Sequence, residues 1–222
     1  GFYFAGCDNL DLQSISTFDL EDVTNLDGFL YGLENVNANL ISNMDTSSAT
    51  SMVSTFEGAT SFNQPLDGWN TTNVTDLTAT FKDATSFNQP LDTWNTTNVT
   101  DLTSTFSGAT NFNQPLDGWN IPGVTSLDYM FYNATSFNQP LNNWSTSNVT
   151  SMVSTFEGAT SFNRALNGWD TTNVTDLTST FKNATSFNQL LDTWDTSNVT
   201  DLTSTFEGAT SFNRALNGWD TT

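Results

Sequence analysis

Carboxylates are the most frequent ionisable side chains in this sequence, and ionisable side chains are the first candidates for chemistry. There are 24 Asp and Glu residues against 4 Lys and Arg, with no His and one Cys. Two sets of Asp recur at a spacing of 25 residues: Asp76 and Asp101, and Asp67, Asp92 and Asp117. Carboxylates stacked at that spacing could bind Ca²⁺ through oxygen ligands, but the sequence has no D-x-D-x-D-G loop. We therefore expect solvated acidic faces and no cofactor, with Ca²⁺ as the alternative.

The composition argues against several classes of protein. Without His, and with only one Cys, the chain lacks most of the residues used for metal and nucleophile chemistry, so we expect no enzyme. A formal net charge of −20 repels nucleic acids and anionic membrane surfaces. No apolar run approaches the ~20 residues that would cross a bilayer. The 18 Phe and 7 Trp residues nevertheless require a core.

Asparagine sequons are the second group of residues that could carry chemistry, as sites of modification. N-x-T/S triplets begin at Asn70, Asn73, Asn95, Asn98, Asn133, Asn143, Asn148, Asn173, Asn183 and Asn198. In a eukaryotic secretory host these would be N-glycan acceptors on solvent-facing turns. The alternative is that such triplets arise freely in an Asn/Thr-rich repeat, and that Asn73 caps a helix.

The elements that position these residues follow from a repeat of 25 residues. Seven contiguous units run from 45 to 219, residues 220–222 begin an eighth, and the 19 residues from Ser154 recur unchanged from Ser204. Such a period predicts a stacked solenoid. Residues 1–44 fit the period poorly, so we expect an N-terminal cap with a degenerate repeat.

Within one unit, the spacing of apolar residues predicts a short helix followed by an extended segment. Val74, Leu77, Phe81 and Ala84 lie on one helical face, and Asn73 is placed to cap that helix. Gly, Asp or Asn stands two residues after each Phe of that column, which predicts a left-handed residue there. Pro90 and its equivalents then forbid further helix and favour one strand-like segment per coil. Coils would stack at about 4.7–5 Å.

Three columns should hold the stack together. The aromatic columns include Phe56, Phe81 and Phe106, and Trp69, Trp94 and Trp119, which we expect to point inward. The third column consists of Asn63, Asn88, Asn113, Asn138, Asn163, Asn188 and Asn213. We expect these Asn residues to form a buried ladder in which each amide bonds to the backbone of the next coil.

The repeat pattern resembles a known family. The pattern "NVTDLTSTFxxATSFNQPLDxWxT", seen at 173–196 with Leu in place of Pro at 190, resembles the ~25-residue repeat of BspA-like leucine-rich-repeat surface proteins. The resemblance covers 45–222, about four-fifths of the chain. It implies a right-handed, leucine-rich-repeat-like solenoid on a secreted or surface-anchored protein that serves in adhesion, without catalytic residues.

Cys7 has three interpretations. The A-G-C sequence resembles a lipobox, although a mature lipoprotein would begin at the Cys itself. A disulfide to material outside this chain and an inert thiol in the cap are the alternatives.

Three functions agree with these features. The first is an extracellular or cell-surface adhesion scaffold that binds a protein or glycan. The second is a subunit of an extracellular, glycosylated filament, since the last unit has no polar cap and open solenoid ends associate head to tail. The third is ice binding through the unbroken row Thr60, Thr85, Thr110, Thr135, Thr160, Thr185 and Thr210.

Overall fold

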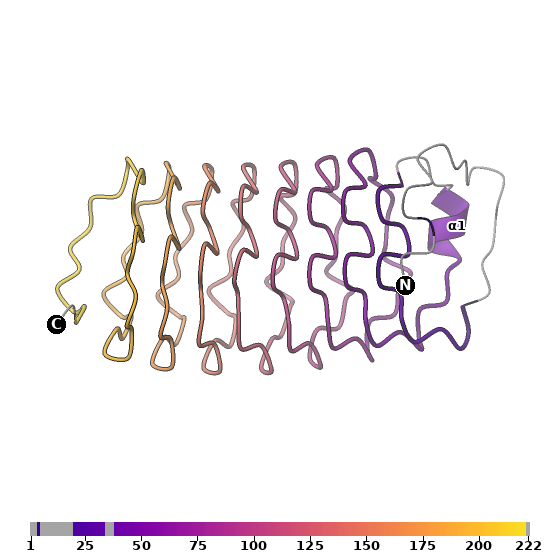
Figure 1. Ribbon diagram of the computed structural model, residues 1–222, viewed down its shortest axis with the longest axis horizontal. Coiled ribbons are helices and arrows are strands. Elements are labelled where there is room, and N and C mark those ends of the chain that lie inside the picture. Colours follow the sequence, from indigo (N-terminus) through magenta and orange to yellow (C-terminus); the bar gives the residue numbers. More distant parts are fainter. Residues whose placement is uncertain (1–3, 5–19, 34–37, 221–222) are drawn as a thin grey trace.

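The repeats stack as successive coils along the long axis of the molecule. The computed structural model describes Phe4, residues 20–33 and residues 38–220, and Figure 1 shows the coils side by side in sequence order. Cys7 lies outside the described residues. The chain is therefore a tandem-repeat solenoid, as the period predicts. Residues 20–33 pair with the first full unit, because the N–H groups of Leu26 and Leu30 donate to the carbonyls of Ser51 and Thr55.

Regular secondary structure is nearly absent from the described part of the chain. Its only helix is α1, Ala38–Ser42, and it contains no multi-residue strand. Isolated parallel bridges join adjacent coils: Asn25 with Ser51, Ser51 with Asp76, Asp76 with Asp101, Ser126 with Ser151, Ser151 with Asp176, and Asp176 with Asp201.

The predicted helix is wrong, because the segment from 74 to 84 folds as consecutive turns. The N–H groups of Thr80 and Lys82 donate to carbonyls three residues earlier, those of Leu77 and Ala79. The N–H groups of Ala79 and Phe81, which alternate with these along the chain, donate instead to the carbonyls of Thr103 and Thr105 in the next coil. An α-helix would use all of these donors within the segment and leave none for the neighbouring coil. Asn73 does not cap a helix, since its amide nitrogen donates to the carbonyl of Ser47.

The predicted strand over the second half of each unit is also wrong. A turn bonded from Trp94 N to Leu91 O ends this half, and no strand is assigned over 87–94. Side chains join the coils here instead, as where Asn88 N–H donates to Oδ1 of Asn63 over 2.9 Å. A ladder of amides therefore replaces the backbone ladder that we expected.

Left-handed backbone occurs twice in each unit. The predicted column is confirmed at Gly58, Asp83, Gly108, Asn133, Gly158, Asn183 and Gly208, with φ between 53° and 71°. A second column, which the sequence did not indicate, consists of Ser54, Ala79, Ser104, Tyr129, Ser154, Ser179 and Ser204. These residues break the right-handed path that a helix would need. They are the local reason for the turns.

The core consists of aromatic columns that run the length of the stack. The ring of Phe81 lies 5.2 Å from that of Phe56, 5.5 Å from that of Phe106 and 4.2 Å from that of Phe87. Adjacent Trp rings are stacked with centroids 6.2–6.5 Å apart. The Trp94 indole N–H donates to the carbonyl of Leu66 in the preceding coil. Among the described residues, every buried side-chain nitrogen or oxygen has a hydrogen-bond partner.

Candidate functional site

The Asn column forms a continuous ladder along one side of the stack. Oδ1 of Asn113 accepts the backbone N–H of Asn138 over 2.9 Å and the amide of Gln139 over 3.1 Å. Equivalent backbone bonds link all seven Asn residues. The expected burial is wrong, because these side chains are exposed or half-buried at the rim of the core.

We predict that Asn113→Ala lowers the free energy of unfolding by about 1 kcal/mol, because the Asn138 N–H and Gln139 amide lose an acceptor at a half-buried position. Asn113→Asp keeps an acceptor oxygen there and should lose less. Urea unfolding followed by Trp fluorescence measures both variants. Equal stability of Asn113→Ala and the parent chain would contradict a stabilising role for the ladder.

The sequon Asn residues are all exposed, but their side chains differ in what they bond. The side-chain amide N–H donates a hydrogen bond to a carbonyl of the preceding coil in Asn73, Asn98, Asn148, Asn173 and Asn198. Asn70 and Asn95 instead accept the N–H of the residue two positions on. Asn133 and Asn183 occupy the left-handed column.

One of the two stacked sets of Asp residues caps turns. Asp76 and Asp101 each accept, through Oδ1, the backbone N–H two residues further on, over 2.9 and 2.8 Å. Asp67, Asp92 and Asp117 are exposed. Over Phe4, 20–33 and 38–220, no three or more acidic or Cys side chains gather into a metal-binding group.

Similar caps lower the pKa of several carboxyl groups. The backbone N–H and then the hydroxyl of Thr172 lower the pKa of Asp170, and the hydroxyl and then the N–H of Ser197 lower that of Asp195. Ser47 and Thr203 do the same for Asp45 and Asp201. A folded-state pKa below the ordinary 3.8 means that the stabilisation is complete above that pH and is lost as pH falls through the folded-state value.

We therefore predict that the melting temperature falls as pH drops below about 4, and that Asp170→Asn/Asp195→Asn reduces this fall. Asn70 and Asn95 form the same turn in other coils, so the amide should preserve the fold. Circular dichroism melts from pH 6 to pH 2 measure the effect. Identical acid limbs for the parent and the double variant would contradict it.

Threonines form two rows on the outside of the stack. The row from Thr60 to Thr210 is half-buried, except at its exposed ends. A second row, which the sequence did not indicate and which we call the exposed Thr row, is exposed at every coil: Thr24, Thr50, Thr75, Thr100, Thr125, Thr150, Thr175 and Thr200. Most of these hydroxyls donate to the Thr carbonyl of the preceding coil over 3.1–3.2 Å. This holds the side chains in one orientation. Ice binding through Thr rows stays a prediction.

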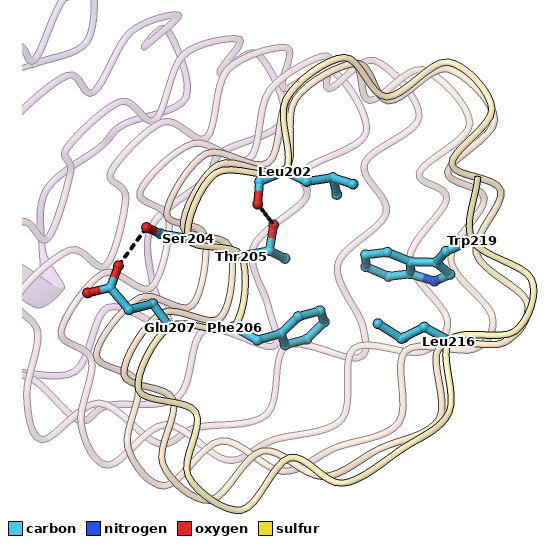
Figure 2. Close-up of a pocket in the computed structure, with 7 residues that line it drawn as sticks. All are labelled: Leu202, Ser204, Thr205, Phe206, Glu207, Leu216 and Trp219. Atoms are coloured by element: carbon cyan, nitrogen blue, oxygen red, sulfur yellow. Dashed lines mark hydrogen bonds between the residues drawn. The ribbon is translucent and has the colours of Figure 1, made fainter. Parts of the chain in front are cut away.

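The last described coil presents an apolar pocket along the stack axis. Leu202, Phe206, Leu216 and Trp219 point into the interior of this coil, and Figure 2 shows them with Thr205, Ser204 and Glu207. In the preceding coil, the N–H groups of Leu177, Ser179 and Phe181 donate to carbonyls of residues 201–205. The equivalent donors of Leu202, Ser204 and Phe206 have no further coil to bond within the described residues.

Among the described residues, no helix has the length and apolar character needed to cross a membrane.

Comparison with known proteins places the repeat in a family. No curated protein and no solved structure matches the chain. One family model matches three overlapping segments, residues 2–116, 67–169 and 161–222. The chain therefore belongs to the family described as "Mycoplasma protein of unknown function, DUF285".

Proposed function

We propose that this chain is a non-enzymatic extracellular or cell-surface scaffold that binds a protein or glycan partner through the sides of the stack. The observation that carries the proposal is the exposed Thr row, Thr24 to Thr200, in which six of the eight hydroxyls donate to the preceding coil. A rigid row of identical groups suits a partner that is itself extended or repetitive. The resemblance to BspA-like leucine-rich-repeat proteins favours the same role.

An array of immobilised glycans and extracellular-matrix proteins tests this role. Thr100→Gln/Thr175→Gln alters the exposed Thr row, and Thr93→Gln/Thr193→Gln alters two exposed threonines of another column that also donate to preceding-coil carbonyls. We expect the first double variant to lose binding and the second to retain it. Equal binding by both variants would exclude the Thr row as the contact face. Protection of the chain from protease added to intact cells would overturn surface exposure.

A head-to-tail filament is the second candidate, and the pocket of the last coil favours it. The pocket combines apolar side chains with a row of N–H donors, the arrangement that each internal coil presents to the next. Two copies joined at this same end would place N–H groups opposite N–H groups, which cannot bond to each other. A partner copy must therefore present its opposite end, with its carbonyl groups, so that both stacks run in the same direction. If the chain continues beyond Thr222, its own next coil would cover this face, whereas a second copy is the candidate for a chain of this length.

Electron microscopy with intact-mass measurement on native material tests the filament. Filaments with an axial repeat of one chain length, lost in Phe206→Asp, would support it, and a mass per chain that falls on enzymatic removal of N-glycans would add the predicted glycosylation. Discrete rods at the sequence mass would exclude both.

A further inference from the structure

The coil of residues 120–144 carries a side chain that the repeat does not explain. Tyr129 occupies the second left-handed column, where every other residue is Ser or Ala. Its φ is 56° and 41% of its surface is exposed. A left-handed conformation is costly for a bulky residue, and burial does not compensate the cost here. Unusual backbone of this kind is a reason to look for function.

A second tyrosine lies beside the first. The Tyr132 ring is 6.0 Å from the Tyr129 ring at an interplanar angle of 67°, so the two rings form an aromatic corner. Ser104 and Ser107 hold the equivalent positions in the preceding coil, and Ser154 and Glu157 hold them in the following coil. The corner is therefore flanked by small side chains and by one carboxylate. We call Tyr129 and Tyr132 the tyrosine corner.

The charges of the molecule decide what chemistry fits the tyrosine corner. The faces of tyrosine rings attract cations, and two rings at an angle can contact one cation from two sides. The chain's formal net charge of −20 attracts cations and repels anionic ligands. The Glu157 carboxylate accepts a hydrogen bond from Ser154 over 2.6 Å and lies 3.7 Å from Lys182, so it retains acceptor capacity.

We propose that the tyrosine corner is the contact point for an ammonium or guanidinium group on a basic protein partner. This inference rests on the proposed scaffold function and specifies its partner as a protein with exposed Lys or Arg. The regular coils would supply the rigid support, and the 120–144 coil would supply the specific contact. A neutral sugar stacked on the same rings is the competing occupant, which the experiment separates.

The variant Tyr129→Ser tests the proposal without endangering the fold, because Ser is the usual residue of that column. Leu190→Ala is the matched control, since Leu190 is the other large apolar side chain exposed among the described residues. Two peptides serve as probes, Gly-Arg-Gly-Lys-Gly with blocked ends and the same peptide with norleucine in place of Arg and Lys. A neutral oligosaccharide, cellohexaose, is the third probe. Tyr ring NMR signals report binding at the corner.

We expect the basic peptide to shift the Tyr129 and Tyr132 signals saturably, with affinity about ten-fold weaker in Tyr129→Ser and unchanged in Leu190→Ala. Equal shifts from the norleucine peptide would overturn the proposal in favour of nonspecific apolar binding, and stronger shifts from cellohexaose would assign the corner to a glycan. No saturable shift from any probe would also overturn it. If array binding persists in Tyr129→Ser while peptide binding is lost, the scaffold function has a second contact face. If Tyr129→Ser loses array binding but still binds the basic peptide, the tyrosine corner is not the cation contact. That result would overturn this proposal and leave the scaffold function standing.

Discussion

Phe131→Ala is expected to lower the free energy of unfolding by about 3–5 kcal/mol. The Phe131 side chain has no exposed surface. Its ring lies 5.8 Å from that of Phe106 in the preceding coil, 5.6 Å from that of Phe156 in the following coil and 4.0 Å from that of Phe137 in its own coil. Rings of three coils would line the cavity, and the stack cannot shorten at one column to fill it.

The position of Phe131 near the middle of the array predicts how the variant unfolds. Stability in a solenoid is approximately a sum of unit and neighbour-interface terms, so a weak central interface can uncouple the two halves. We expect urea unfolding of Phe131→Ala, followed by Trp fluorescence and circular dichroism, to show two transitions. Phe206→Ala is the control, since Phe206 lies in the last described coil, is only half-buried and should cost less. A single transition with a loss equal to that of Phe206→Ala would contradict the argument.

The aromatic columns and one left-handed column could be predicted from the sequence, for simple reasons. Columns such as that of Phe81 keep their spacing of 25 residues, and only a stack brings such residues together. The residue two positions after that Phe is always Gly, Asp or Asn, which are the types that tolerate positive φ. Composition and spacing were enough for both features.

The local path of the chain could not be predicted, because two structures share one pattern. Apolar residues at 74, 77, 81 and 84 suit a helix, and they equally suit a run of turns whose alternate N–H groups bond to the next coil. The choice between them depends on left-handed residues such as Ser54 and Ala79. Neither residue type signals positive φ, so tertiary bonding overrode local preference.

The tyrosine corner left a weak signal in the sequence. Met130 interrupts a column that is Thr in every other full unit, and Asp128 stands where the other units have Thr or Val, which marks the coil as unusual. The exposure of Tyr129 and its position beside Tyr132 depend on the left-handed turn, and that turn emerges only in three dimensions. The sequence does not mark the exposed Thr row for a related reason, because the period alone does not say which columns face solvent.

The left-handed column from Gly58 to Gly208 restricts which coils can be neighbours. Gly and Asp or Asn alternate without exception from Gly58 to Gly208. A Cβ placed at Gly158 would overlap Oδ1 of Asn133 and lie 3.1 Å from its Cγ, and Gly108 and Gly208 meet the preceding Asp83 and Asn183 in the same way. At Gly58, the nearest atom to such a Cβ is Cα of Gly32, 3.9 Å away. An Asp or Asn in one coil therefore favours Gly in the next, and the repeating structural unit is a pair of coils.

Gly158→Ala should consequently lower the free energy of unfolding by about 2–4 kcal/mol, whereas Gly58→Ala should lower it by only about 1–2 kcal/mol. Both glycines have positive φ, 70° and 71°, so alanine pays the same backbone cost at each position, and the difference measures the overlap with Asn133. Adding Asn133→Gly to Gly158→Ala removes the overlapping side chain and should recover most of that difference. Urea unfolding of the parent chain, Gly158→Ala, Asn133→Gly and the double variant gives the coupling energy between the two sites. Additive losses would mean that the alternation has a cause other than contact between adjacent coils.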